Sequence, residues 1–202
     1  MNYESNVKMN KIIFATNNQH KVEEIQSAIG KVIEVISLKE AGIHIEIPEP
    51  HDTLEENASE KSRAIHELTG MDCFSEDTGL EADSLNGEPG VKSARYAGED
   101  KAFDKNIDKL LSSLANSNNR KARFRTVISL LLNNNEYFFE GICEGEISNV
   151  RKGNKGFGYD PVFVPAGSNK SFAEMGMEEK NKFSHRKKAV DKMIWFLQEK
   201  IE

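Results

Sequence analysis

The chain has 202 residues, of which 38% are hydrophobic and 30% charged, and its mean hydropathy is −0.59. A chain of this length can bury a core without disulfides, and its mixed composition excludes disordered, collagen-like and coiled-coil proteins. The aliphatic stretch at residues 127–132 is far too short to span a membrane. Because residues 1–10 are polar and unlike a signal peptide, we expect a soluble cytoplasmic protein with an N-terminal arm (1–10) and a single domain (11–202).

The charge balance argues against one class of partner. There are 27 Lys and Arg residues against 33 Asp and Glu, which gives a net charge of −6. A nucleic acid polymer needs a positive surface, so we expect none as a partner. A small polyanion stays compatible with this charge, because a few local cations can bind it. Cys73 and Cys143 have no metal-type spacing and are expected to be core thiols.

The first elements alternate between strand and helix. Residues 11–16 form an apolar run that ends at a polar turn, which predicts a buried strand. A helix is predicted from Lys21 to the stop signal at Gly30, and residues 32–38 alternate like a strand. This β-loop-α-β order is typical of the start of an α/β fold.

A second helix is predicted after a proline-containing loop at residues 46–52. Thr53 and Glu56 form a capping box, and the helix then runs to about Leu68 before the stop signal at Gly70. Its inward-facing residues are expected to be Leu54, Ala58, Ile65 and Leu68. Residues 71–74 follow as a short strand and residues 75–79 as a turn.

The rest of the chain predicts two more helices and a hairpin. A helix is expected at 100–114, and strands at 124–132 and 137–147 are joined by residues 133–136. Glycine-rich loops are expected at 85–98 and 152–159. The apolar face of the third helix is expected to be Phe103, Ile107, Leu110 and Leu114, and that of a C-terminal helix capped by Ser184 to be Val190, Ile194, Leu197 and Ile201.

Two polar segments could carry chemistry near the N-terminal half. Residues 16–21 lie between a strand and a helix N-terminus, where unpaired backbone N–H groups and the helix dipole favour an anion. This segment is either a phosphate cradle or an ordinary polar turn with a capping Asn. Glu76 and Asp77 are adjacent acids after a strand, and because neighbouring residues of an extended segment point opposite ways, we expect only one of them to enter a site. Without nearby Cys or His they suit Mg²⁺, although a solvated acidic turn fits the same residues.

Two further segments lie in the C-terminal half. Residues 153–161 offer glycines for close approach and two aromatic rings, Phe157 and Tyr159, on which a base could stack. A flexible loop with one inward ring is the alternative. The basic run at 178–188 is typical of a solvated face, but His185 and Arg186 in the first turn of a helix oppose its dipole, which hints at a nearby anion or acceptor.

In this order the segments resemble the inosine triphosphate pyrophosphatase family, over most of the chain from about Lys11 to Leu197. The matching blocks are Phe14 to Lys21, Thr53 to Lys61, Ser75 to Leu80, Pro89 to Tyr96, Gly156 to Pro161, and Glu179 to Asn181 with Ser184 to Arg186. The chain departs from many members at Glu76, where they have Asp, and at Asn17, where they have Gly.

The resemblance implies an α/β fold with a long bent mixed β-sheet flanked by helices, two lobes with a central cleft, and a homodimer. It implies hydrolysis of the noncanonical purine nucleoside triphosphates ITP, dITP and XTP to the monophosphate and pyrophosphate, with Mg²⁺ as cofactor. Asp77 matches the catalytic base, and Glu49 and Asp77 match metal ligands. The substrate-binding matches are Thr16, Asn17, Asn18, Gln19, His20, Lys21, Lys61, Thr78, Phe157, Gly158, Tyr159, Asp160, Lys180, His185 and Arg186.

From these residues we hypothesise that Lys21, Lys61 and Lys180 offset phosphate charge while Asp77 activates water. Arg186 or His185 would donate to the 6-oxo group of hypoxanthine, and Asp160 or the backbone would accept from its N1–H, which disfavours adenine. Three alternatives stay open: a pyrophosphatase for modified pyrimidine or standard nucleotides, a nucleotide-binding module without turnover, and an RNA-binding protein that uses residues 182–188.

Overall fold

The structure is a computed structural model that describes residues 11–30 and 33–201. The predicted N-terminal arm, residues 1–10, and the start of the predicted strand at residue 32 lie outside this part of the chain. None of the helices in it is long and apolar enough to cross a membrane.

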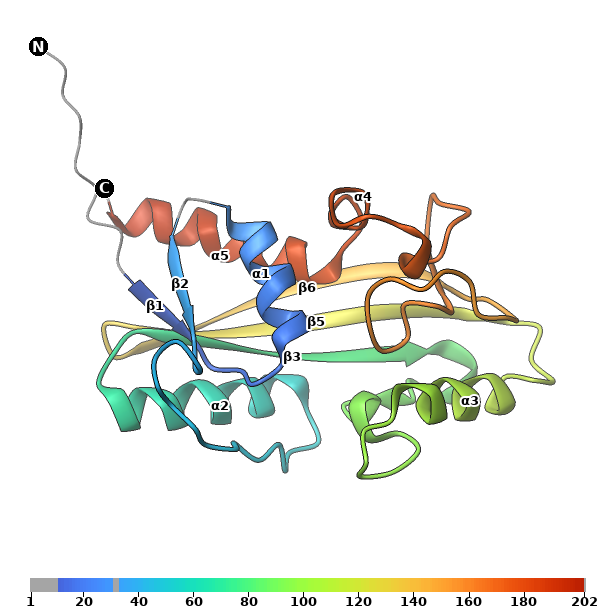
Figure 1. Ribbon diagram of the computed structural model, residues 1–202, viewed down its shortest axis with the longest axis horizontal. Coiled ribbons are helices and arrows are strands. Elements are labelled where there is room, and N and C mark those ends of the chain that lie inside the picture. The colour runs from blue at the N-terminus through green and yellow to red at the C-terminus, as the bar shows by residue number, and fades with distance from the viewer. Residues whose placement is uncertain (1–10, 31–32, 202) are drawn as a thin grey trace, which may run out of the picture.

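One mixed sheet of seven strands organises the molecule (Figure 1), in the order β2-β1-β3-β5-β6-β7 with β4 paired to β3. β1 runs parallel to β2 and β3, and the remaining pairs are antiparallel. The predicted long mixed sheet flanked by helices is therefore confirmed. The strands are β1 (Lys11–Phe14), β2 (Glu34–Ser37), β3 (Cys73–Ala82), β4 (Pro89–Gly90), β5 (Lys121–Leu132), β6 (Asn135–Ile147) and β7 (Phe163–Pro165).

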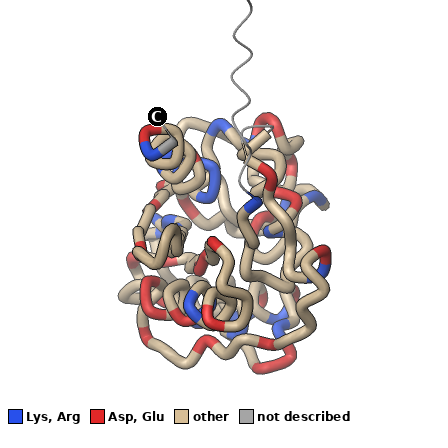
Figure 2. The backbone as a smooth tube through the Cα atoms, turned by 90° about the vertical axis from the view of Figure 1, so that its left-hand side faces the viewer, with Lys and Arg blue, Asp and Glu red and all other residues tan. Residues whose placement is uncertain are grey.

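The helices cover both sides of the three long strands. In Figure 1, α1 and α5 lie above β3, β5 and β6, whereas α2 and α3 lie below them. The bounds are α1 (Gln19–Ile29), α2 (Leu54–Thr69), α3 (Phe103–Ser113), α4 (Met177–Asn181) and α5 (His185–Ile201), with 3₁₀ turns η1 (Asp83–Leu85), η2 (Ser93–Arg95) and η3 (Phe172–Glu174). Basic and acidic positions are interspersed along the backbone in the view of Figure 2.

Local chemistry explains where several elements begin and end. Asn18 caps α1 by accepting from the backbone of Lys21, and Gly70 ends α2 in the left-handed conformation. Thr53 caps α2, but its hydroxyl also donates to the Glu56 carboxylate, so only half of the predicted capping box forms. The predicted β5–β6 hairpin closes through Asn133 and Asn134 at φ 50° and 60°, the positive values that a two-residue turn requires.

The predicted turn at residues 75–79 is wrong, because these residues lie inside the ten-residue strand β3. Gly79 is needed for close approach and not for a turn, since a Cβ there would lie 2.7 Å from the carbonyl oxygen of Gly90 in β4. The polar side chains are tolerated because the fold supplies partners, such as the Ala58 carbonyl of α2 for the Ser75 hydroxyl.

The prediction that Leu68 and Phe103 face inward is also wrong. Leu68, near the end of α2, is 59% exposed, and Phe103, at the start of α3, is 41% exposed. Both lie at helix ends, where the chain leaves the sheet. The inner residues of these helices, Ala58 and Ile65 of α2 and Ile107 and Leu110 of α3, are buried as predicted.

Burial also determines the protonation and reactivity of the two cysteine thiols. Cys73 and Cys143 are free and buried, as expected. Burial raises the pKa of Cys73 to about 12 and that of Cys143 to about 11. Both are therefore inert core thiols at neutral pH.

Helix α5 sits directly on strand β6 at a glycine. A Cβ on Gly141 would overlap the carbonyl oxygen of His185 and lie 2.5 Å from the backbone nitrogen of Ala189. Both neighbours are backbone atoms of α5, so no side-chain rotation can relieve the overlap. Gly141 therefore fixes how closely the first turn of α5 approaches the sheet.

We predict that Gly141→Ala destabilises the protein by about 1–3 kcal/mol, the usual cost of overpacking. The overlap would push the start of α5 away from β6. The measurement is the free energy of unfolding in urea. Gly176→Ala is the matched control, because a Cβ there has no heavy atom within 4 Å. Equal stability of the two variants would contradict the close approach.

Candidate active site

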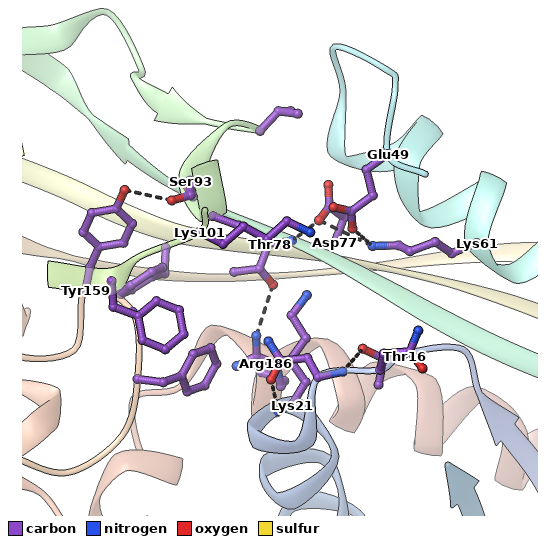
Figure 3. Close-up of a pocket in the computed structure, with 18 of the residues that line it drawn as sticks. Thr16, Lys21, Glu49, Lys61, Asp77, Thr78, Ser93, Lys101, Tyr159 and Arg186 are labelled. Carbon is purple, nitrogen blue, oxygen red and sulfur yellow. Dashed lines mark hydrogen bonds and ion pairs between the residues drawn. The ribbon is translucent and has the colours of Figure 1, made fainter. Parts of the chain in front are cut away.

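The cavity lies along an unpaired stretch of β3. β1 pairs with β3 only as far as Phe74, and β4 pairs with it from Leu80 onward. In the described part of the chain, residues 75–79 therefore have no strand on that edge, and a cavity of about 260 Å³ opens there (Figure 3). Because it lies beside the end of β1, at the edge of β3, residues from both faces of β3 reach it. Its walls come from the α1–α2 end and from the α3–α4 end of the molecule, which agrees with the expected central cleft between two lobes.

Most of the residues predicted for the site line this cavity. They are Thr16, Asn17, Asn18, Lys21, Glu49, Lys61, Asp77, Thr78, Phe157, Gly158, Tyr159, Asp160, Lys180, His185 and Arg186. Gln19 and His20 are not among the lining residues. The ring of His20 instead stacks on Phe157, with centroids 5.1 Å apart.

The loop before α1 has features of both structures expected from its sequence, the polar turn with a capping Asn and the phosphate cradle. Asn18 is a capping Asn, and its own backbone N–H donates to the Thr16 hydroxyl at 3.2 Å. Asn17 donates to the carbonyl of Ile45 and so ties the loop to the segment before α2. The capped N-terminus of α1 nevertheless faces the cavity, which is the arrangement that favours an anion.

The adjacent acids Glu76 and Asp77 have different surroundings. Asp77 lines the cavity, whereas Glu76 is buried and bound by Lys21 at 2.9 Å and by Arg186 through two hydrogen bonds of 3.1 Å. The prediction that only one acid enters the site is confirmed. The Thr78 hydroxyl donates to Glu76 at 2.9 Å and lies 2.5 Å from that of Thr126, and the Thr78 backbone N–H donates to Asp77 at 3.0 Å.

Asp77, Lys61 and Glu49 form a compact charged group at one end of the cavity. The Lys61 ammonium donates to Glu49 and, at 2.8 Å, to the carbonyl of Glu76, and it lies 3.6 Å from Asp77. Arg95 donates to the carbonyl of Glu49 from the other side at 2.9 Å. Burial raises the pKa of Asp77, and the nearby Lys61 only partly offsets this effect. Such a carboxylate accepts a proton more readily than an exposed one.

A chain of alternating carboxylates and cations runs beneath the cavity; we call it the ion-pair chain. It consists of Asp160, Lys180, Glu24, Arg186, Glu76 and Lys21. Lys180 donates to Asp160 at 2.6 Å and to Glu24 at 2.7 Å, and Arg186 joins Glu24 to Glu76. Three carboxylates alternate with three cations, so the chain is electrically balanced.

The pKa directions show which groups hold the chain together. Burial alone would raise the pKa of Glu24, but Arg186 and Lys180 hold it below the ordinary value. Burial alone would lower the pKa of Arg186, but Glu76 and Glu24 raise it. Burial raises the pKa of Asp160 despite its contact with Lys180. Glu24 and Arg186 thus stay ionised because they are paired.

Aromatic and heteroaromatic rings lie at the other end of the cavity. His185 stacks on Phe124 with ring centroids 4.6 Å apart, and burial, followed by Arg186 and Lys180, lowers its pKa well below the ordinary value. Its imidazole is therefore neutral at physiological pH. Its Nδ1 atom is buried and has no hydrogen-bond partner among the described residues. Tyr159 donates its hydroxyl to the carbonyl of Ser93, which ties this end to η2.

Glu24 and Lys101 are among the residues of this region that the sequence did not predict. Glu24 is central to the ion-pair chain, and its only local signal is its position three residues after Lys21 on the same helix face. Lys101 lines the cavity from the segment before α3, and nothing in its surrounding sequence distinguishes it from other surface lysines.

The donor set fits Mg²⁺ only with help from a ligand. In the described ranges no group of three or more His, Cys, Asp and Glu side chains is placed to hold a metal. Glu49 and Asp77 supply two carboxylates on either side of Lys61. Mg²⁺ often binds one or two carboxylates together with phosphate oxygens and water. These residues could therefore hold Mg²⁺ once a phosphate is present.

We predict that Glu24→Gln lowers stability by about 3 kcal/mol at pH 7, because two buried cations each lose a carboxylate partner. The folded pKa of Glu24 is depressed from 4.5, so the stability it contributes is present above about pH 4.5 and is lost below it. The difference from wild type in urea unfolding should therefore shrink in acid.

The neighbouring Glu23→Gln provides the matched control. Glu23 is exposed and only 4.0 Å from His20, so its removal should change stability by less than about 0.5 kcal/mol. A difference between the Glu24→Gln variant and wild type that stays constant down to pH 3 would refute the assigned role of Glu24.

The sequence model of the Ham1 family matches residues 12–196. The dITP/XTP pyrophosphatases of Flavobacterium johnsoniae and Porphyromonas gingivalis are each 50% identical to this chain, covering 91% and 94% of it and 96% and 98% of the relatives. The solved structure of the Staphylococcus aureus Ham1 protein superposes with a TM-score of 0.84 at 38% identity, covering 94% of this chain and 99% of that one. A Coxiella burnetii HAM1 structure superposes with a TM-score of 0.86 at 35% identity, covering 95% and 100%. The resemblance seen in the sequence is confirmed, and the chain belongs to the Ham1 family.

Proposed function

We propose that the protein hydrolyses noncanonical purine nucleoside triphosphates, namely dITP, XTP and ITP, to the monophosphate and pyrophosphate. The names of the relatives support the substrate class. One structural observation carries the proposal: the unpaired edge of β3 presents Asp77 to a cavity that is also lined by the N-terminus of α1 and, at its other end, by aromatic rings. Removal of such nucleotides from the cell's pool is the role that follows.

The two ends of the cavity suit the two ends of a nucleotide. The backbone N–H groups at the start of α1, with Thr16 and Asn18, offer donors to phosphate oxygens. The aromatic end, with Phe157 and His185, offers flat surfaces to a base. A substrate that spans the cavity places its α-phosphate near Asp77.

Charge balance argues for a metal in this reaction. The cations of the ion-pair chain are already neutralised by buried carboxylates, and Lys61 is bound by Glu49. A triphosphate brings several negative charges that these groups do not offset. We propose that Glu49 and Asp77 hold Mg²⁺, which would neutralise charge on the phosphate oxygens.

Asp77 is the proposed general base. Its carboxylate would accept a proton from the attacking water, while the water oxygen bonds to the α-phosphorus. The bond between the α-phosphorus and its bridging oxygen breaks, and pyrophosphate leaves. Lys61, held at 3.6 Å from Asp77, keeps the carboxylate oriented and stabilises charge beside it.

The contacts of Lys180 and Arg186 favour roles other than those hypothesised from the sequence. Lys180 lies between Glu24 and Asp160, within 5.5 Å of the Phe157 ring centroid, so its place favours support of the base end over neutralisation of phosphate. Arg186 donates its hydrogen bonds to Glu24, Glu76 and Thr78. His185, with an unpartnered buried nitrogen, is the better candidate for reading the base.

The proposal also includes a homodimer in the cytoplasm. The homodimer rests on the resemblance of the sequence to its family, and the cytoplasmic location on the polar character of residues 1–10.

We predict that the wild-type protein with Mg²⁺ converts dITP to dIMP and pyrophosphate, and that EDTA abolishes this turnover. Asp77→Asn should lower kcat by about 10²-fold or more, the usual contribution of a general base. Products are identified by chromatography and phosphorus NMR. Asp83→Asn, at an exposed position just beyond β3, serves as the control and should retain activity. Release of dIDP and phosphate would rule out the proposed reaction.

We predict that His185→Phe lowers the preference for ITP over ATP, measured as the ratio of kcat/KM values, by at least about tenfold. The phenyl ring preserves the stacking on Phe124 but removes both nitrogens. Arg186→Ala tests the competing donor in the same assay. An unchanged ratio in the His185→Phe variant would transfer the donor role to Arg186 or to the backbone.

A further inference from the structure

The cations that line the cavity fall into two groups. In the described part of the chain these are Lys21, Lys61, Lys101, Lys180 and Arg186. Four of them are within 4 Å of a carboxylate, as the ion pairs above show. Lys101 forms no ion pair and no side-chain hydrogen bond with any described residue, although it lines the same cavity.

The backbone at Lys101 is unusual for its residue type. Its φ is 51°, a left-handed conformation that residues other than Gly, Asn and Asp rarely adopt. Its N–H reaches back to the carbonyl of Gly98 at 3.4 Å, and α3 begins two residues later. Backbone of this kind occurs often in segments that contact ligands.

The side chain extends toward the charged group at the phosphate end. In Figure 3, Lys101 runs across the pocket on the side of Ser93 and Thr78 and points toward Asp77 and Glu49. The N-terminus of α1, with Thr16 and Lys21, lies on the opposite side of the same view. A polyphosphate bound at Asp77 would therefore have the α1 loop on one side and Lys101 on the other.

We propose that Lys101 is a substrate-binding residue that contacts the β- and γ-phosphates, the part of the nucleotide that leaves as pyrophosphate. This inference rests on the proposed function. The interior cations orient groups but carry little uncompensated charge, whereas Lys101 contributes a full positive charge from an exposed segment. It contacts no base, because its side chain points to the Asp77 end and away from Tyr159.

The test compares the binding of the two products by calorimetry. Lys101→Gln keeps most of the side-chain length and removes the charge. It should weaken binding of inorganic pyrophosphate with Mg²⁺ by about tenfold, the effect of one lost charge contact near a protein surface. Binding of dIMP should change by less than about twofold. Equal losses for both products, or no loss for pyrophosphate, would overturn the proposal.

Lys105→Gln is the matched control. Lys105 is an exposed cation of α3, paired with Asp100, and its removal changes the net charge by the same amount. It should leave the affinities for pyrophosphate and dIMP unchanged. A loss of pyrophosphate affinity equal to that of Lys101→Gln would show that only the long-range field matters, which would also overturn the proposal.

Lys101→Gly separates a backbone role from a charge role. Glycine adopts a φ of 51° without strain, so this variant should be at least as resistant to thermal unfolding as Lys101→Gln. Its pyrophosphate affinity should fall as far as that of Lys101→Gln. Full affinity in Lys101→Gly would refute the charge role. Because calorimetry needs no turnover, absence of dITP hydrolysis by the wild type would contradict the proposed function, while the calorimetric result would still decide whether Lys101 binds pyrophosphate.

Discussion

The shape of the cavity depends on how the fold neutralises buried charge. Glu24 of α1 and Glu76 of β3 bind Arg186 of α5, and Glu24 also binds Lys180 of α4. An ionised group that is buried alone costs several kcal/mol, so these groups are tolerated only together. Four elements, α1, β3 and the consecutive α4 and α5, are therefore fixed to one another beside the cavity by contacts more directional than apolar packing.

Because of this balance, interior cations and exposed cations have different roles. A neutralised network holds hydrogen-bonding groups in place but attracts a polyanion weakly. In the reaction we propose, Mg²⁺ at Glu49 and Asp77 and an exposed side chain such as Lys101 would supply the net positive charge. The net charge of −6 is thus compatible with a triphosphate ligand, because the relevant cations act within a few ångströms and not through the overall field.

Local chemistry was sufficient to predict the helix ends and the hairpin, because one or two residues such as Gly70 or Asn134 decide them. Most lining residues followed from the family resemblance. The role of Glu24 could not be predicted, since Glu23 beside it is the same residue type and is exposed. What distinguishes them is contact with Lys180 and Arg186, which lie 156 and 162 positions later in the chain.

The length of β3 also could not be predicted from the local sequence, and it explains the location of the site. Ser75 to Gly79 reads locally as a turn, yet β5 pairs with every one of these residues on one edge. On the other edge β1 has ended and β4 has not begun, so five residues of a buried strand have no neighbouring strand within residues 11–30 and 33–201. Ser75, Glu76 and Asp77 are at most 6% exposed, because other parts of the fold cover this edge. Ser75 and Glu76 are bound by groups from α2 and α1, and Asp77 and Thr78 line the cavity, so the same polar stretch is both paired within the fold and available to a ligand.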